Sequence, residues 1–359
     1  MRHYSFPFIF FLNFVLAPLS EIIEPFFGRY DFIYSYTGYS VVVISFLLTL
    51  PYLSRYAIKI NSAFFITLSF IIIYLLIVVS LNQNPSSIAT LFSFLLFFYF
   101  FYFGYSLPDE YLIHKYFSRF LFFAVFLLFG FTLLYLYLFY NGLLNRVGYS
   151  NPIGMAFSFF FFKNASISTL FVIILFFLSI GKRFEIIPII ILAGYFIYSR
   201  PRYLFHVIFS ISLVFFIFVS SGFFDRWPIN NSIDFNDITS GRFNEIVYIS
   251  KLIISEPWSI FFGLSNAAIL QFISDFGKLT VHNGIFFLIM HLGFFVSSVL
   301  LYLFVRSIFY DIKRYGLNFV NFYCLIYLIS MFFSTAFISN MLFSISLGIL
   351  YSNRSFKLS

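Results

Sequence analysis

Long runs of apolar residues follow one another along almost the whole chain and are separated by short polar stretches. Apolar runs of roughly 17–25 residues are typical of transmembrane helices, because a helix of that length crosses the hydrocarbon core of a bilayer. Such runs lie near residues 4–20, 31–53, 62–81, 87–107, 116–140, 152–163, 165–180, 185–199, 203–221, 284–305, 317–335 and 337–351. The pattern predicts an all-α polytopic membrane protein with about 12 transmembrane helices, forming a single integral membrane domain over residues 1–359.

The distribution of positive charge predicts which helix ends face the cytoplasm. With the N-terminus inside and about twelve spans, the inner loops carry most of the 21 Lys and Arg residues, as the positive-inside rule requires. Merging the short runs at 152–163 and 165–180 into one span would reverse the N-terminal half and lose this bias. Lys182 and Arg183 nevertheless fall on the outer side. Three topologies therefore remain possible for residues 152–221: two short helices, one interrupted span or a re-entrant segment.

One polar stretch, residues 222–280, is much longer than the other connections and falls on the outer side. Within it, residues 243–255 have apolar positions at helical spacing, and Pro257 is expected to end that helix. Its apolar face is assigned to Phe243, Ile246, Val247, Ile253 and Ile254. A second short amphipathic helix is predicted over 267–276, after Gly263. We therefore expect residues 222–280 to form a helical cap lying on the outer face of the membrane.

Composition supports a membrane protein and excludes several other classes. Of the 359 residues, 62% are hydrophobic and only 9% are charged, which is too little charge to cover a water-soluble domain of this size. The formal net charge of +8 would suggest a nucleic-acid partner in a soluble protein. Here it is expected to reflect cytoplasmic loops, so no nucleic-acid partner is predicted. The single cysteine, Cys324, cannot form an internal disulfide.

Sequence motifs for several other kinds of chemistry are missing. The chain contains no Walker A loop, no G-x-G-x-x-G, no H-E-x-x-H and no Cys/His zinc pattern. Asp234 and Asp237 lie close together in the outer loop, but no third ligand is spaced to join them. No acidic residue falls within a central span, as proton relays in transporters usually require. Neither a metal ion nor a cofactor is expected, and ATP hydrolysis, zinc proteolysis and proton-coupled transport lose support.

The start of the first loop helix is a candidate anion site. Thr239 or Ser240 can cap it, which leaves free backbone N–H groups at the positive end of the helix dipole. Arg242 adds a planar fork of donors at the same place, and the combination suits a phosphate or pyrophosphate. Taken alone, Arg242 is also compatible with an ordinary solvated loop cation.

His282 closes the same loop and is a candidate proton acceptor, because an imidazole with an ordinary pKa of about 6.5 can act as a base at neutral pH. The alternative is an interfacial histidine satisfied by water or lipid headgroups. Asn283 is expected to cap the helix that begins near Gly284. His291 lies about two and a half turns further on, so it points to the opposite face. The two histidines are therefore not a metal pair, and His291 is expected to be a packing residue.

Two further arginines border apolar spans. Arg146 stands in an outer loop just before the helix start at Pro152. Arg200 follows Ser199 between two apolar spans, where a charge at the edge of the hydrocarbon is a functional candidate. The alternative for Arg200 is a positive anchor on the inner side, which the orientation derived above favours.

These features occur along the chain in a characteristic order. They are Arg146 before Asn151-Pro152, Ser199-Arg200 after an apolar span, Gly241-Arg242 opening the large outer loop, Pro257-Trp258 and Phe262-Gly263-Leu264 within it, and His282-Asn283 at its end. In this order, over roughly residues 141–305, the chain resembles the O-antigen polymerase and O-antigen ligase superfamily of bacterial inner-membrane glycosyltransferases. The remainder of the chain resembles that superfamily in its apolar pattern alone.

The resemblance implies a metal-independent transfer at the periplasmic face, from an oligosaccharide linked through pyrophosphate to undecaprenol. The lipid bilayer and a chain-length regulator protein are the other partners it suggests. Arg242 would bind the donor pyrophosphate with help from Arg146 and Arg200, and His282 would accept the proton of the acceptor hydroxyl. Gly241 and Asn283 would contribute to substrate binding.

Arg200 departs from the family pattern, because the charge rule places it on the inner side rather than on the reaction side. A repeat-unit polymerase is favoured over a ligase, since the chain is compact and its inner loops are short. A lipid-linked oligosaccharide flippase is an alternative of a different class, although such transporters usually lack a large structured outer cap.

Overall fold

The computed structural model describes most of the chain from Arg242 onward and shorter parts of the rest. The described residues are 42–50, 69–74, 76–77, 85–107, 242–276, 281, 283–333 and 341–352, with single positions at 134, 137, 198, 205, 208, 209 and 212. Every regular element among them is an α-helix, which confirms the all-α class for the described residues. One of these helices, Gly284–Tyr315, is long and apolar enough to cross a membrane by length and composition. Most other predicted spans lie outside the described residues, so their number stays a prediction.

The longest helix is α14 (Gly284–Tyr315), which begins where the sequence predicts and runs past the predicted end. Asn283 is its N-cap, and Gly316 follows its last residue with φ 73°, a value that glycine adopts without a steric penalty. The apolar run ends near residue 305, but the helix does not. Lys313 and Arg314 in its last turn interact favourably with the negative end of the helix dipole.

A break divides α14 at Gly293, which the apolar pattern does not predict. Gly293 has φ 79° and ψ 163°, a conformation far from helical and essentially restricted to glycine. The helix therefore consists of a short N-terminal segment and a longer C-terminal one. No proline or charged residue marks this point in the sequence. The cause of the break lies in what packs against it.

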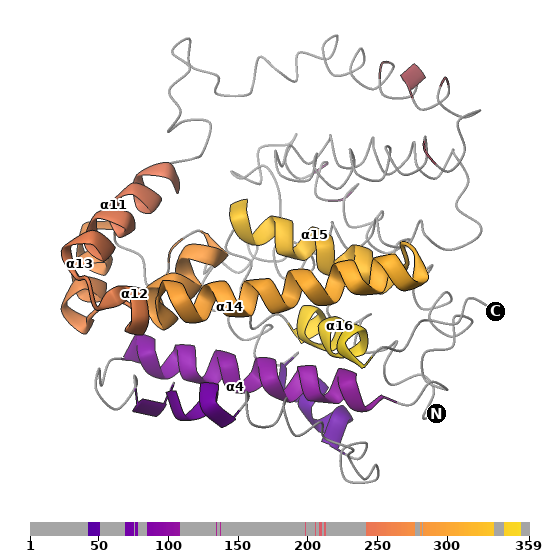
Figure 1. Ribbon diagram of the computed structural model, residues 1–359, viewed down its shortest axis with the longest axis horizontal. Coiled ribbons are helices and arrows are strands. Elements are labelled where there is room, and N and C mark those ends of the chain that lie inside the picture. Colours follow the sequence, from indigo (N-terminus) through magenta and orange to yellow (C-terminus); the bar gives the residue numbers. More distant parts are fainter. Residues whose placement is uncertain are drawn as a thin grey trace.

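Three further helices form a small bundle with α14 (Figure 1). They are α4 (Pro85–Ser106), α15 (Phe319–Phe333) and α16 (Met341–Tyr351), which correspond to the predicted runs at 87–107, 317–335 and 337–351. Phe304 of α14 links them, because its ring lies 5.7 Å from Phe97 of α4 and 5.8 Å from Phe343 of α16, measured between centroids. Aromatic rings from three helices thus meet in the core of this bundle.

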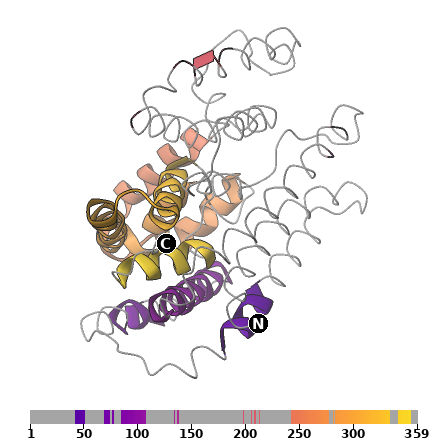
Figure 2. The same cartoon turned by 90° about the vertical axis from the view of Figure 1, so that its right-hand side faces the viewer.

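Helices α4 and α16 lie against each other over much of their length (Figure 2). A Cβ added to Gly348 would lie 2.0 Å from the carbonyl oxygen of Phe101, and one added to Gly104 would lie 2.1 Å from that of Ile345. The two backbones can touch only because both crossing positions are glycine. Close contact through small residues is typical of helices that associate in lipid, where dispersion rather than water exclusion holds them together.

A buried polar cluster fixes the turn between α14 and α15. Asp311 accepts hydrogen bonds at its Oδ2 from the Nδ2 atoms of Asn318 (3.0 Å) and Asn321 (2.8 Å). The Oδ1 of Asn318 also accepts from the backbone N–H groups of Val320 and Asn321, so this residue caps α15. The Oδ1 of Asn321 accepts in return from the backbone N–H of Asn318. The cluster therefore caps α15 and ties its start to the last turns of α14.

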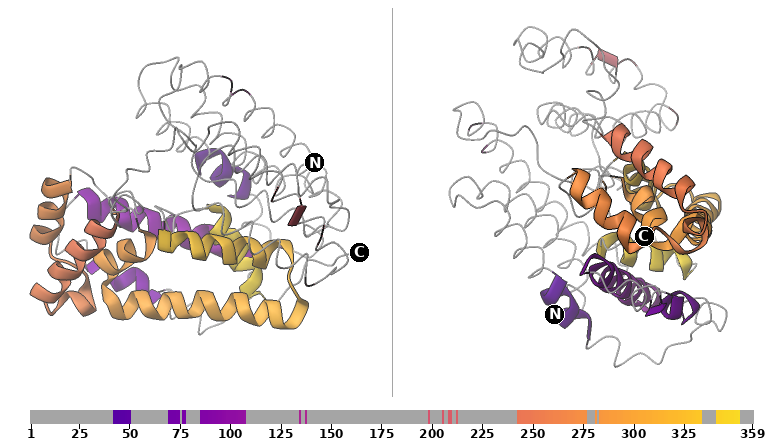
Figure 3. Two further views of the ribbon diagram at one scale, coloured as in Figure 1. Left: turned by 90° about the horizontal axis from the view of Figure 1, so that it is seen from above. Right: turned by 90° about the vertical axis from the view of Figure 1, so that its left-hand side faces the viewer.

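Three short helices gather at the N-terminal end of α14 (Figures 1 and 3). They are α11 (Arg242–Ser255), α12 (Ser259–Phe262) and α13 (Asn266–Phe276). The predicted helices at 243–255 and 267–276 are confirmed to within one residue, and α12 was not predicted. We call residues 242–276 the cap. Its packing against α14 brings the chain on both sides of residue 282 next to α11.

The apolar face assigned to α11 is wrong. Phe243 and Ile254, which were placed on the inward face, are 41% and 78% exposed, whereas Ile249 is fully buried. Ile253 packs against the cap core only in part. The helix is apolar on more than one side, so spacing alone did not determine which side turns inward. Contact with α13 and α14 selected the side that carries Ile249.

Candidate functional site

The predicted site residues divide into those the structure describes and those outside it. Arg146, Arg200, Gly241 and His282 lie outside the described residues. Arg242 is the first residue of α11, as expected for a residue at a helix start that could bind an anion. Asn283 is described in full. The predicted meeting of Arg242 and His282 at one site therefore stays a prediction, and the described surroundings of these positions give its framework.

Asn283 anchors the start of α14 and joins it to α15. Its Oδ1 accepts hydrogen bonds from the backbone N–H groups of Ile285 (3.0 Å) and Phe286 (3.1 Å), which confirms the predicted N-cap. Its Nδ2 donates to the carbonyl oxygen of Phe332, near the end of α15. Asn283 is 5% exposed. In this geometry both polar groups of the side chain hold helices in place, and a substrate contact of Asn283 stays a prediction.

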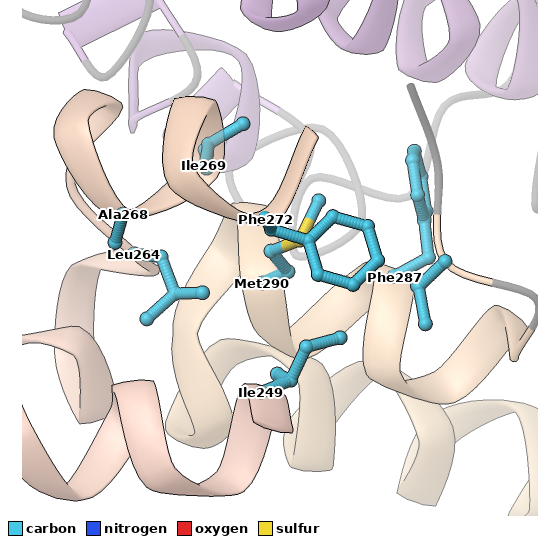
Figure 4. Close-up of a cluster of buried hydrophobic side chains, with 8 residues drawn as sticks. Ile249, Leu264, Ala268, Ile269, Phe272, Phe287 and Met290 are labelled. Carbon is cyan, nitrogen blue, oxygen red and sulfur yellow. The ribbon is translucent and has the colours of Figure 1, made fainter. Parts of the chain in front are cut away.

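A compact apolar core joins the cap to the start of α14 (Figure 4). Its buried members are Ile249, Leu264, Ala268, Ile269, Phe272, Val281, Phe287 and Met290. Ile249 comes from α11 and Val281 is the residue before His282, so α11 and the end of the long loop share one core. Arg242 precedes Ile249 by about two helical turns, or about 10 Å along the axis. The shared core therefore fixes the helix that carries Arg242 relative to the loop end.

Glu245 is a buried acid that the sequence interpretation overlooked. It lies in the first turn of α11, three residues after Arg242, and only 2% of it is exposed. A carboxylate in the first turn is stabilised by the positive end of the helix dipole. Burial of an ionised carboxylate is costly without such compensation. The signal available in the sequence was an acid within a mostly apolar helix, one turn from a candidate pyrophosphate-binding arginine.

Two polar links hold the cap helices to one another. The Tyr248 hydroxyl of α11 donates to Oδ2 of Asp275 in α13. This hydrogen bond, with smaller effects of burial and of the carboxylate charge, raises the pKa of Tyr248 above its ordinary value. Glu256 accepts from the backbone N–H (2.9 Å) and the hydroxyl (2.6 Å) of Ser265, so the two ends of the α12 segment are tied together.

The break in α14 is where the cap and the bundle interlock. A Cβ on Gly293 would lie 2.6 Å from the carbonyl carbon of Phe261, and one on Gly263 would lie 2.6 Å from the carbonyl oxygen of Met290. The same Met290 oxygen accepts a hydrogen bond of 2.8 Å from the backbone N–H of Leu264. The two glycines therefore let α12 lie directly on the backbone of α14.

Tyr74 joins this interlock from a different part of the chain. Its hydroxyl lies within hydrogen-bonding distance of the carbonyl oxygens of Phe261 (2.9 Å) and Leu292 (3.1 Å). Leu292 is next to the break, where its carbonyl would otherwise lack a helical partner. Tyr74 thus satisfies backbone groups of α12 and α14 at the point where both are irregular.

His291 is a packing residue, as predicted. It is buried, and its ring lies 4.6 Å from that of Phe287 between centroids. Within the ranges that the structure describes, no three His, Cys, Asp or Glu side chains gather in a group that could hold a metal ion.

Comparison with protein-family models, curated proteins and solved structures finds no match for this chain. The site must therefore be interpreted from its own geometry. That geometry consists of a helix start bearing Arg242 and the buried Glu245, held by a shared core beside the loop end that precedes α14. Backbone N–H groups at such a start favour an anion, whereas the Glu245 carboxylate in the same turn disfavours one, so pyrophosphate binding there stays a prediction.

Proposed function

We propose that this chain is a bacterial inner-membrane glycosyltransferase that polymerises the repeat units of O-antigen or a related surface polysaccharide. The observation that carries the proposal is the shared core of the cap, to which α11, the residue before 282 and the start of α14 all contribute buried side chains. This arrangement supports a site formed by two segments that are distant in sequence. The order of motifs that resembles the O-antigen polymerase and ligase superfamily supports the choice of chemistry.

In this proposal the chain crosses the inner membrane with about twelve helices, and the cap lies on the periplasmic side. The charge bias along the sequence supports that orientation. Helices α14 and α15 run antiparallel, since Asn283 at the start of α14 bonds to Phe332 near the end of α15, so both of these ends would lie on the same side of the membrane. Lys313 and Arg314 at the opposite end of α14 then face the cytoplasm.

The reaction is a displacement at the anomeric carbon of a sugar linked through pyrophosphate to undecaprenol. An acceptor hydroxyl oxygen forms the new glycosidic bond while the bond from the anomeric carbon to the pyrophosphate oxygen breaks. The leaving undecaprenyl pyrophosphate keeps the electron pair, and Arg242 stabilises its growing charge with Arg146. Arg200 joins them only if residues 152–221 place it on the periplasmic side, which the charge rule opposes. His282 takes the hydroxyl proton. No metal ion or cofactor takes part in the proposed step.

The test is the lipopolysaccharide profile of a deletion strain on a gel. A polymerase deletion leaves lipopolysaccharide with a single repeat unit. Lipopolysaccharide without any repeat unit would identify a ligase instead, and absence of the lipid-linked unit from the periplasm would identify a flippase. Either of the last two results overturns the polymerase assignment.

Complementation then tests the residues. His282→Ala should lower chain extension by roughly 10²–10⁴-fold at unchanged protein level, because general-base catalysis is lost. Arg242→Lys should also be impaired, since a point charge cannot reproduce a bidentate fork. Lys251→Arg, an exposed basic position on the same helix, is the matched control and should behave as wild type. Normal long-chain polymer from His282→Ala would exclude its role as the base.

A further inference from the structure

We propose that residues 257–264 form a re-entrant wedge that enters the acyl-chain region of the outer leaflet. The wedge comprises α12 with Pro257 and Trp258 before it and Gly263 and Leu264 after it. The sequence had suggested a cap that lies on the membrane surface. The inference rests on the membrane placement of α14 made under the proposed function and is independent of the transfer reaction.

The position of the wedge along α14 gives its depth. It contacts the backbone at Gly293, which follows Gly284 at the start of α14 by about 14 Å along the axis. The apolar run of α14 ends near residue 305, about 18 Å beyond Gly293. The longer segment alone is shorter than the hydrocarbon thickness of about 30 Å, so part of the segment before Gly293 must also lie in the hydrocarbon. Gly293, and with it the wedge, therefore lies inside the hydrocarbon layer and nearer its outer boundary.

Tyr74 gives a second and independent measure of the depth. It lies within the predicted apolar span 62–81, whose outer end is residue 81 in the orientation derived from charge. Seven residues separate Tyr74 from that end, or about 10 Å along a helix. Its hydroxyl bonds to the carbonyl oxygen of Phe261 within the wedge. Two different helices thus place the wedge at a similar depth.

The side chains of the wedge suit a lipid environment. Trp258 is 74% exposed, and Phe261 and Phe262 are about half exposed. The wedge contains no charged residue. The exposed apolar surface continues onto Phe294 and Phe295, the first residues of α14 beyond the break. Because this surface adjoins the exposed side of an apolar helix of membrane-crossing length, lipid acyl chains are its occupant.

The backbone of the wedge is also compatible with hydrocarbon, where polar groups that lack partners are not tolerated. The N–H groups of Ser259, Gly263 and Leu264 donate to the carbonyl oxygens of Glu256, Ser259 and Met290, respectively. The carbonyl of Phe261 accepts from Tyr74. The residues that flank the wedge are joined as well, because the carboxylate of Glu256 accepts hydrogen bonds from the backbone N–H and the hydroxyl of Ser265.

Trp258 offers a direct measurement, because Trp227 is the other of only two tryptophans in the chain. The full-length Trp227→Phe variant is reconstituted in vesicles of lipids brominated near the carbonyl end or near the methyl end of the acyl chain. Trp258 fluorescence should be lost in both kinds of vesicle. Iodide in the aqueous phase should have little effect.

A second variant separates this inference from the membrane placement of α14. Tyr302→Trp, combined with Trp227→Phe and Trp258→Phe, puts the only reporter at an exposed position of α14 beyond the break. If bromine quenches the reporter at position 302 but not Trp258, the wedge is overturned while α14 remains a span. If bromine quenches neither, the membrane placement itself fails. Shielding of Trp258 from both bromine and iodide would mean that a protein surface, such as a second copy, covers it, and this also overturns the wedge.

Discussion

Replacing Gly293 with alanine tests the interlock between α12 and α14. The added Cβ would lie 2.6 Å from the carbonyl carbon of Phe261 and 2.7 Å from its oxygen, well inside normal contact distance. The conformation at Gly293 costs a residue with a side chain about 1–3 kcal/mol. Overpacking against fixed atoms adds about 1–3 kcal/mol. We therefore expect Gly293→Ala to destabilise the folded protein by about 2–6 kcal/mol.

Gly316 provides a matched control at the end of the same helix. Its φ of 73° and ψ of −178° resemble those of Gly293, but a Cβ there would meet nothing within 4 Å. Gly316→Ala should therefore show only the conformational cost of about 1–3 kcal/mol. Thermal unfolding of the purified variants in nanodiscs, followed by the loss of monodisperse protein on size-exclusion chromatography, compares the two. Equal losses for both variants would show that contact with α12 contributes no stability, and the interlock would be refuted.

Three other predictions concern the helix contacts. Gly348→Ala should separate α4 from α16, since its Cβ would lie 2.0 Å from the Phe101 carbonyl oxygen. It should lower the unfolding temperature far more than the control Ser298→Ala, which changes an exposed position. Similar unfolding temperatures for the two variants would contradict the close crossing. Asn283→Ala should cost about 1–2 kcal/mol for the lost cap. Asn283→Asp keeps the acceptor but sets a buried carboxylate oxygen against the carbonyl oxygen of Phe332, so it should be no milder in the same assay. The pKa of Tyr248 is raised in the folded state, so its link to Asp275 stabilises the cap fully below the unfolded-state pKa of 10.0 and is lost as pH rises through the folded-state value. Proteolysis of the cap should accordingly accelerate as the pH rises above about 10, and Tyr248→Phe should remove that pH dependence.

The sequence predicted the helices of the described region well, because local signals determined them. Apolar runs located α4, α14, α15 and α16, and the end of α11 follows from Pro257. The cap of α14 was predicted from Asn283, whose side chain bonds to N–H groups two and three residues further on. Each of these features depends on residues within one or two turns, so the order of side chains is sufficient to specify it.

The candidate site was predicted only in outline. The start of α11 at Arg242 follows from the sequence, but the buried face of that helix and the burial of Glu245 do not. A helix with apolar residues on several sides can pack in several orientations, and the local pattern does not distinguish them. The choice was made by Phe272 and Phe287, which come from other helices and fill the space against Ile249.

The sequence by itself therefore determined the helical class, the apolar character of the chain, the positions of several helices and the order of candidate residues. Tertiary structure alone decided where α14 breaks and how the cap lies on it. At Gly293 the chain gives up the helical conformation because Phe261 approaches its backbone and because Tyr74 and Leu264 bond to the carbonyl groups beside the break. Those partners lie far from Gly293 in the sequence, and a local pattern contains no information about contacts made at that range.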